Sequence, residues 1–352
     1  MVPNRHYLVG SRIHVELPTI VIGLCGDLHE DEIMIDFPPP GAFTQTYPTK
    51  PVRVIEPFGV GGGPDLTARA LGEKLSELWR QPVMVENHPG AGSTTAPALV
   101  AKSPADGYTL LVNTSAHPYS AALINRLPYD PLNDFIPIAP LTSQPYVLVA
   151  GKPAGITTVG DLVAAAKAKP STIKFGSSGI GTATHFGVEK FNLEAGIKAI
   201  HVPARPGDAI ADTIANTVAG RTTYLMAPIP LALADIRAGK LHALGVSTMK
   251  RSSSLPEVPT IAEAGVPGFD FPIWYGIWVR AGTPTGMVDK LSKDIARVMT
   301  APDLRDQLAT HGTDPINMTQ PEFARFVLGE SESASRIIKA AGIKTLRIAD
   351  QL

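Results

Sequence analysis

The chain has 352 residues, of which 44% are hydrophobic and 18% charged, and this is enough apolar material for two ordinary domains. Its 31 basic and 32 acidic residues nearly cancel, which excludes the basic surface of a nucleic-acid-binding protein or of a protein that lies on anionic membranes. The single cysteine, Cys25, excludes an intramolecular disulfide and a cysteine-based zinc site.

The first 46 residues differ from the rest of the chain. Their apolar stretch, residues 17–24, contains Pro18 and is too short to span a bilayer. Glu16 precedes this stretch and acidic residues follow it, so it makes a poor export signal. We therefore expect residues 1–46 to be an atypical tail, either a weak signal with a linker or an extension upstream of the true start.

From residue 47 onward, strand and helix patterns alternate. Strands are predicted at residues 52–58, 82–86, 108–113, 146–150, 173–176, 200–202, 224–226 and 243–247. Helices are predicted at residues 66–79, 96–102, 159–168, 185–194, 208–218, 231–238, 284–299 and 321–341. Thr158 and Asp161 have the spacing of a capping box at the start of one of these helices. The alternation predicts an α/β fold with two mainly parallel sheets and flanking helices.

A glycine-rich corner follows the first predicted strand. Four glycines within residues 59–63 lead through Pro64 and Asp65 into a helix. Glycine lets a ligand approach bare backbone N–H groups, and the first amides of a helix favour an anion. Neither a phosphate loop nor a dinucleotide-binding motif fits, because no Gly-Lys-Ser/Thr follows and Pro64 stands where a third glycine is needed. The alternative is a tight turn capped by Asp65.

Similar corners follow three later strands, at residues 87–94, 113–117 and 177–185. Each offers small residues, hydroxyl groups and free amides where a helix begins. Several neutral corners of this kind around one cleft would hold a small anion by backbone dipoles, with Arg205 as a possible additional partner.

The motifs resemble one known family in their order along the chain. They are residues 47–51 (YPTKP), 57–65 (PF, GG and D), 85–92 (VENHPGAG), 106–111 (DGYTLL), 129–131 (YDP), 178–185 (SGIGT and H), 201–203 (HVP), 238–241 (AGKL), 259–265 (PT and EAG) and 281–284 (AGTP). Over residues 47–330, the chain resembles the Bug/TctC-type receptors, the periplasmic solute-binding proteins of tripartite tricarboxylate transporters.

This resemblance implies a two-lobed, periplasmic-binding-protein-like fold of type II with a ligand cleft between the lobes. Lobe 1 would comprise residues 47–143 and 268–352, and lobe 2 residues 144–267, joined by two crossovers. The implied function is a non-catalytic periplasmic receptor that captures a small dicarboxylate, tricarboxylate or aromatic carboxylate and delivers it to membrane permease subunits. We expect a monomer with no cofactor, no metal and no nucleic-acid partner.

The resemblance and the corner pattern together give the candidate ligand-binding residues. The family positions in the first lobe are Phe58, Gly61, Gly62, Asp65 and Ser115, and those in the second lobe are Ser178, Gly179, Thr182 and His185. The corner pattern adds Gly63, Asn87, Thr184 and Arg205. The chain departs from the family after His-Val-Pro, where Ala204, Arg205 and Pro206 replace the usual Tyr-Lys-Gly. We expect this departure to reshape the second half of the pocket.

Two other functions fit the same sequence. The first is a hydrolase or lyase that uses Ser178 and His185, although the pattern G-x-S-x-G is absent because Ile180 takes the place of its last glycine. The second is a receptor that signals its ligand state to a sensor partner. The nine histidines show no H-E-x-x-H pair, so no metal site is predicted. Trp274, Tyr275 and Trp278 are expected in core and hinge packing.

Overall fold

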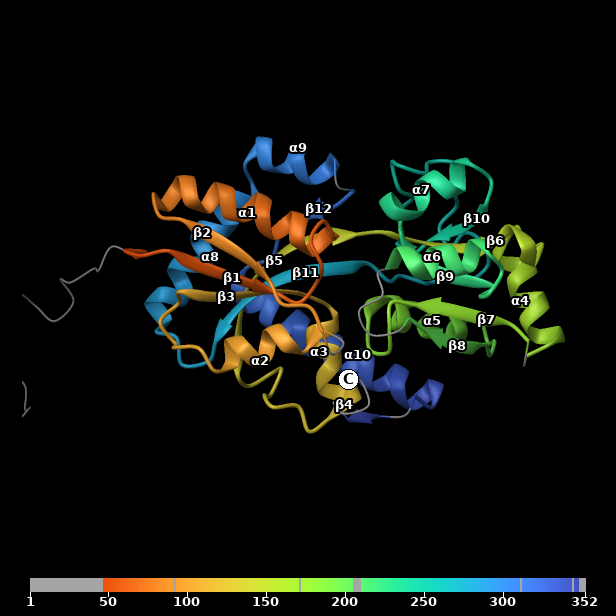
Figure 1. Ribbon diagram of the computed structural model, residues 1–352, viewed down its shortest axis with the longest axis horizontal. Coiled ribbons are helices and arrows are strands. Elements are labelled where there is room, and N and C mark those ends of the chain that lie inside the picture. Colours follow the sequence, from red (N-terminus) through yellow and green to blue (C-terminus); the bar gives the residue numbers. More distant parts are fainter. Residues whose placement is uncertain are drawn as a thin grey trace, which may run out of the picture. The chain divides into compact units, whose positions relative to one another are not determined.

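Two β-sheets carry the α/β fold of the computed structural model (Figure 1). The structure describes residues 47–90, 93–170, 172–204, 210–310, 312–343 and 345–347, all of which belong to one unit, Gln45–Leu352. The predicted tail, residues 1–46, lies outside the described residues. No helix in these ranges combines the length and apolarity that crossing a membrane requires.

The first sheet has six strands in the order β12-β5-β11-β3-β1-β2. They are β1 (Val52–Glu56), β2 (Val83–Asn87), β3 (Thr109–Thr114), β5 (Phe135–Gln144), β11 (Ile273–Arg280) and β12 (Asp314–Pro315). Strand β1 pairs parallel with β2 and β3, whereas β11 pairs antiparallel with both β3 and β5, and β12 pairs antiparallel with β5. Strands β1, β2, β3 and β5 therefore share one direction, and β11 and β12 run against it.

The second sheet has five strands in the order β10-β6-β9-β7-β8. They are β6 (Tyr146–Gly151), β7 (Lys174–Ser177), β8 (Ile200–Pro203), β9 (Tyr224–Pro228) and β10 (Leu241–Val246). Strand β7 pairs parallel with β8 and β9, whereas β6 pairs antiparallel with β9 and β10. Only β6 therefore runs against the other four strands.

Four strands in each sheet share one direction, as the prediction of mainly parallel sheets requires, whereas β6 and β11 at the two crossovers and the short strand β12 run against them. The chain leaves the first sheet at Gln144 and enters the second at Tyr146, whose register partner Pro228 is the last residue of β9. It returns at Ile273, whose partner is Gln144. A strand that enters a sheet at the carboxyl ends of its neighbours must run against them, which explains β6 and β11. The lobe boundaries after residues 143 and 267 remain a prediction.

Helices cover both faces of each sheet, because successive strand residues point to opposite sides. Helices α1 (Gly63–Trp79), α8 (Thr285–Met299) and α9 (Pro302–Thr310) pack with Val54 and Val112 on one face of the first sheet. Helices α2 (Thr95–Ala101) and α10 (Gln320–Ala341) pack with Ile55 and Leu111 on the other (Figure 1).

On the second sheet, α4 (Val159–Ala168) and α5 (Ala183–Glu194) share a core with Leu148, whereas α6 (Ile210–Val218) and α7 (Ile229–Arg237) share one with Val147 and Val149. The short helix α3 (Ala116–Leu123) leads from β3 into β4 (Ile124–Asn125), which pairs with β13 (Leu346–Arg347). A 3-10 turn, η2 (Lys152–Ala154), follows β6.

Candidate functional site

The predicted corners lie at the carboxyl ends of strands in both sheets. In the first sheet, Glu56 at the end of β1 pairs with Asn87 at the end of β2, and Thr114 at the end of β3 pairs with Tyr275. In the second sheet, Ser177 ends β7 and leads into α5. The corners therefore lie along the edge of each sheet at which the parallel strands end. Ligands of α/β proteins bind at this edge.

Two carboxylates organise the first corner from within. The Asp65 Oδ2 atom accepts the Gly61 amide at 2.8 Å, and Glu56 Oε2 accepts the Phe58 amide at 2.8 Å. Gly62, and not Asp65, is the N-cap of α1, and its amide reaches the Gly59 carbonyl at 3.3 Å. Asp65 therefore closes the corner from the third position of the helix, and the amides of Phe58 and Gly61 are not free for a ligand.

Asn87 connects these carboxylates and is itself fully used. Its Nδ2 atom donates to Asp65 Oδ1 at 2.8 Å, to the Phe58 carbonyl at 3.2 Å and also to Glu56 Oε1. Its Oδ1 atom accepts Arg69 Nη2 at 2.8 Å, and the same Nη2 lies 2.9 Å from Asp65 Oδ1. Asn87, predicted as a ligand contact, therefore holds Glu56, Asp65 and the Phe58 carbonyl in place.

The two buried carboxyl groups of the corner have opposite electrostatic surroundings. Burial raises the pKa of Glu56 to about 8, against the weaker opposing effect of its bonds to Phe58 and Asn87. Burial also acts to raise the pKa of Asp65, but hydrogen bonds from Arg69, Gly61 and Asn87 outweigh it, so the pKa falls below its usual value. At neutral pH, Asp65 is therefore ionised and paired with Arg69, while Glu56 is mostly protonated.

The first turn of α1 has two amide donors without a partner, of which that of the partly exposed Gly63 is the accessible one, because Asp65 is fully buried. Within the described part of the chain, the amides of Gly63 and Asp65 have no hydrogen-bond acceptor. A helix N-terminus carries a partial positive charge, and α1 has 17 residues to build it. Val60, at the tip of the corner, has 77% of its surface exposed, so solvent reaches this side of the loop.

Tyr275 and Gln144 add a contact that the sequence reasoning missed as part of the site. The Tyr275 hydroxyl donates to Gln144 Oε1 at 2.7 Å, and a Cβ atom at Gly63 would lie only 2.4 Å from that hydroxyl oxygen. Gln144 is the last residue before one crossover and Tyr275 lies just after the other. Gly63 is therefore required for the crossover strands to pack against the start of α1.

The third corner lies next to this contact. The Ser115 amide donates to the Trp274 carbonyl at 3.1 Å, and Ser115 is fully buried. The neighbouring His117 packs against Trp278 and Phe135, and burial lowers the pKa of its imidazole to about 3, so it is a neutral core residue. The expected core packing of Trp274, Tyr275 and Trp278 is observed, since each is at most 2% exposed.

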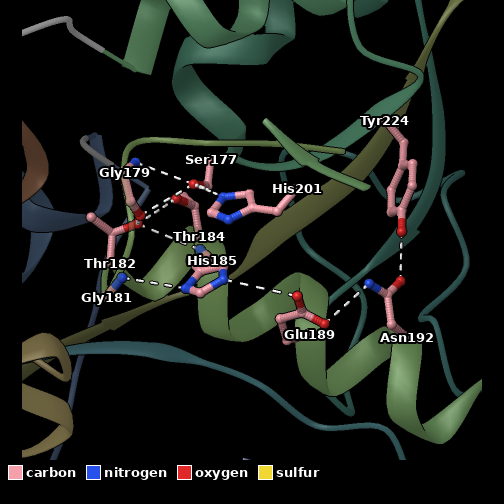
Figure 2. A network of polar contacts seen from close by, with 10 residues as sticks. All are labelled: Ser177, Gly179, Gly181, Thr182, Thr184, His185, Glu189, Asn192, His201 and Tyr224. Atoms are coloured by element: carbon pink, nitrogen blue, oxygen red, sulfur yellow. Dashed lines mark hydrogen bonds and ion pairs between the residues drawn. The ribbon is translucent and has the colours of Figure 1, made fainter. Parts of the chain in front are cut away.

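The corner after β7 forms one continuous polar network (Figure 2). Thr184 Oγ1 accepts the Ser178 amide at 2.9 Å and lies 2.9 Å from Thr182 Oγ1. The Gly179 amide donates to Ser177 Oγ at 3.2 Å, and Thr182 Oγ1 donates to the Gly179 carbonyl at 2.7 Å. The His185 amide donates to Thr182 Oγ1 at 3.4 Å. The network therefore includes five predicted site residues: Ser178, Gly179, Thr182, Thr184 and His185. The amides of Ser178 and Gly179 are thereby engaged.

His185 is a buried, neutral hydrogen-bonding residue. Its Nδ1 atom accepts the Gly181 amide at 3.3 Å, and its ring stacks on His201 with 4.1 Å between centroids. Burial, followed by the neighbouring His201, lowers the pKa of His185 well below its usual value. Burial also lowers the pKa of His201 to about 4. The amides of Ala183 and Thr184 in the first turn of α5, both in buried residues, have no acceptor among the described residues.

Ser178 and His185 do not form the hydrogen-bonded pair that the alternative function, a hydrolase or lyase, would use. Ser178 Oγ accepts Thr184 Oγ1 at 3.2 Å, whereas the histidine that contacts a serine hydroxyl is His201, with 2.6 Å to Ser177 Oγ. Ser177 is fully buried, so a substrate has no access to this hydroxyl. Neither serine therefore has the accessible nucleophile–base arrangement that acyl transfer needs.

The corners of the two sheets are in contact through α3. A Cβ atom at Gly181 would lie 2.6 Å from Leu123 Cδ2, and the rings of Tyr119 and Phe186 are 4.7 Å apart. The predicted contact Arg205 lies outside the described residues, as do Ala91 and Gly92 of the second corner. The described ranges contain no group of three residues able to hold a metal ion.

Two surface hollows are described, and neither is lined by a predicted site residue. One, of about 360 Å³, lies between α9 and β12, and the other, of about 120 Å³, lies beside it near Met299. The chemistry of the corners, and not these hollows, therefore defines the candidate site.

Comparison with known proteins identifies the family. The family described as "Tripartite tricarboxylate transporter family receptor" (TctC) matches residues 67–343. The chain belongs to this family. A similar protein, protein BugT of Bordetella pertussis, is 31% identical over 302 residues, which cover 85% of this chain and 91% of BugT.

Two solved structures share the fold of this receptor over nearly their whole length. The R. palustris protein Rpa4515, solved with adipate, has a TM-score of 0.77 and 31% identity and covers 85% of this chain and 100% of its own. MatC (Rpa3494) from Rhodopseudomonas palustris, solved with bound malate, has a TM-score of 0.73 and 28% identity and covers 83% of this chain and 100% of its own. The predicted family and fold class are thus confirmed.

Proposed function

We propose that this receptor captures a small dicarboxylate, with one carboxylate at the N-terminus of α1 and the other at the N-terminus of α5. The loaded receptor then presents the acid to membrane permease subunits in the periplasm, and it works as a monomer. Binding favours a closed arrangement of the two predicted lobes, because only that arrangement lets both helix ends contact one ligand.

One observation carries this proposal. Each helix begins with two amides that have no acceptor in the described part of the chain, Gly63 and Asp65 in α1 and Ala183 and Thr184 in α5. Two separate pairs of donors, each at the positive end of a helix dipole, match two carboxylates better than one. The only cation of the first corner, Arg69, is already paired with Asp65, so backbone donors must supply the recognition.

The relatives support the same class of ligand. Rpa4515 was solved with adipate and MatC with malate, and both are dicarboxylates. The corner after β7 lacks an accessible serine–histidine pair, which favours a receptor over a hydrolase on the same fold.

Thermal unfolding of ligand-stripped protein tests the proposal. Adipate and malate are the probes, and hexanoate is the matched control because it has the chain length of adipate with only one carboxylate. At a concentration about 1,000 times its dissociation constant, a dicarboxylate adds about 4 kcal/mol to the free energy of unfolding. This corresponds to about 6 °C for a unit of this size.

We expect a clear shift of the unfolding midpoint with at least one dicarboxylate and a much smaller shift with hexanoate. Equal shifts with adipate and hexanoate would contradict the two-ended arrangement. The absence of a shift with every dicarboxylate in a broad panel would overturn the proposed function itself.

A further inference from the structure

Glu56 is a buried carboxyl group that the proposed ligand contacts do not use. It ends β1, its residue is fully buried, and it lies beneath the loop that leads to α1. Its Oε2 atom accepts the Phe58 amide at 2.8 Å and its Oε1 atom contacts Asn87 Nδ2. Both oxygens therefore touch groups that shape the first corner.

The charged residues near Glu56 come from three elements, α1, β2 and β1 itself, which carries Arg53. Helix α1 contributes Asp65 and Arg69, which form an ion pair with 2.9 Å between Nη2 and Oδ1. Strand β2 and the residue after it contribute Glu86 and His88, and Glu86 is held by a bidentate bond to Arg53 with both distances at 2.7 Å. Tyr275 of β11 stays protonated because burial raises its pKa well above the usual value. No unpaired cation among the described residues therefore neutralises Glu56.

The net charge of the corner thus depends on Glu56. Asp65 and Arg69 cancel each other, and Asn87 contacts both carboxyl groups through one amide nitrogen, so the two acids are neighbours. When Glu56 is protonated, the corner is neutral and the amides of Gly63 and Asp65 can attract an anion. When Glu56 is ionised, the corner carries one uncompensated negative charge in a site of low dielectric, where like charges repel strongly.

We propose that Glu56 couples ligand capture to a proton: the corner accepts a carboxylate when Glu56 is protonated and repels it when Glu56 is ionised. This inference rests on the proposed function, because it assumes that a carboxylate occupies the start of α1. It adds that the receptor holds its ligand together with one proton at the Glu56 carboxyl group.

The titration range of Glu56 sets the size of the effect. Burial raises the pKa of Glu56 to about 8. In the free receptor, the Glu56 carboxyl group is therefore mostly protonated at about pH 7 and mostly ionised at about pH 9. A bound carboxylate raises the pKa further, because it adds a negative charge nearby. Affinity should therefore fall about tenfold between pH 7 and pH 9, and binding at about pH 8 should take up roughly half a proton.

Calorimetric titration with adipate, or with malate if it binds more tightly, tests this directly. Both probes are fully ionised in this range, so a change in affinity belongs to the protein. Titration at about pH 8 in two buffers of different ionisation enthalpy counts the protons taken up by wild-type protein, which needs no variant. We expect roughly half a proton per ligand there and only about a tenth of a proton at about pH 7, where Glu56 is already mostly protonated.

Two variants assign the proton to its residue. Glu56→Gln keeps the shape of the side chain but cannot ionise, so its affinity should be nearly constant between pH 7 and pH 9. Glu86→Gln is the matched control, because Glu86 is an acid at the neighbouring position of β2 whose pKa is lowered, first by its bond to Arg53. This variant should keep the tenfold decline of the wild type.

The outcomes separate the two proposals. Binding that is tight and independent of pH, with no proton uptake, would overturn the role of Glu56 and leave the receptor function intact. A decline that persists in Glu56→Gln would assign the proton elsewhere and also overturn it. No binding of any dicarboxylate of the broad panel at about pH 7, where Glu56 is mostly protonated, would overturn the receptor function and the coupling together.

Discussion

Two adjacent glycines in the first corner should respond to substitution in opposite ways. Gly62 has φ −72° and ψ 162°, which any residue adopts, and a Cβ atom there would meet only Gly59 O at 3.4 Å and Pro64 Cδ at 3.8 Å. Gly62→Val should therefore change the free energy of unfolding by less than about 1 kcal/mol, with reduced chain entropy offsetting a poorer N-cap. Its two methyl groups, however, would stand at the entrance to the Gly63 amide.

Gly63→Ala is the contrasting change. Its Cβ atom would lie 2.4 Å from the Tyr275 hydroxyl oxygen, well inside contact distance, so Tyr275 must move. Overpacking of this kind costs about 1–3 kcal/mol, which lowers the unfolding midpoint of a unit of this size by about 2–5 °C. The Gly62 variant should instead lose at least tenfold in dicarboxylate affinity, about 1.4 kcal/mol, with little change in midpoint.

Calorimetric titration with adipate and thermal unfolding of both variants measure these effects. Gly62→Ala serves as the control for Gly62→Val, because its single methyl group should block less of the helix end. Unaltered affinity in Gly62→Val would refute the argument that the α1 amides bind the ligand. An unchanged midpoint in Gly63→Ala would refute the tight packing of Tyr275 against the corner.

Two further predictions concern stability. The Thr158 hydroxyl oxygen accepts the Asp161 amide at 3.0 Å in the capping box of α4. Thr158→Ala should therefore lower the free energy of unfolding by about 1 kcal/mol and the unfolding midpoint by about 1.5 °C. An equal midpoint would contradict the role of the cap. Burial lowers the pKa of His201 to about 4, so the unfolded chain binds more protons below about pH 6.5, and stability should fall as the pH drops from 6.5 to 4. In pH-dependent thermal unfolding, His201→Gln should make this decline shallower by up to about 3 kcal/mol, and an unchanged slope would rule out His201 as its source.

The sequence predicted the regular elements well wherever periodicity was strong. Helix α4 begins at Val159 with the predicted capping box, and α1 extends from Gly63 to Trp79, three residues earlier than predicted. The missed strand β5 contains Pro137 and Pro140, residues that are uncommon inside strands because proline cannot donate to the ladder. Both prolines lie where its register with β11 shifts, at irregularities that tolerate a residue without an amide donor. The missed strand β11 was recognised only as apolar packing around Trp274.

The sequence predicted where the strand-to-helix corners lie but not how each corner is hydrogen-bonded internally. Glycine and hydroxyl residues at strand ends correctly located the corners, because the carboxyl ends of parallel strands lie together. Pairing of the Gly61 amide with Asp65 depends on a positive φ of 85° at Gly61, and no periodic pattern encodes that angle. Glu56 was read as an ordinary strand residue, since its burial beside Asp65 follows only from the packing of α1 on β1.

The internal carboxyl groups beside the proposed anion site do not compete with the ligand, because their geometry holds the binding loop in place. Asp65 fixes the Gly61 amide and Asn87 fixes the loop carbonyl, so the corner holds its shape before a ligand arrives. Ordering a loop on binding reduces affinity, and a corner already held by its own side chains avoids that loss. Because Arg69 neutralises Asp65, this rigidity adds no net charge, and Glu56 is left as the group whose ionisation changes the net charge of the corner from zero to negative.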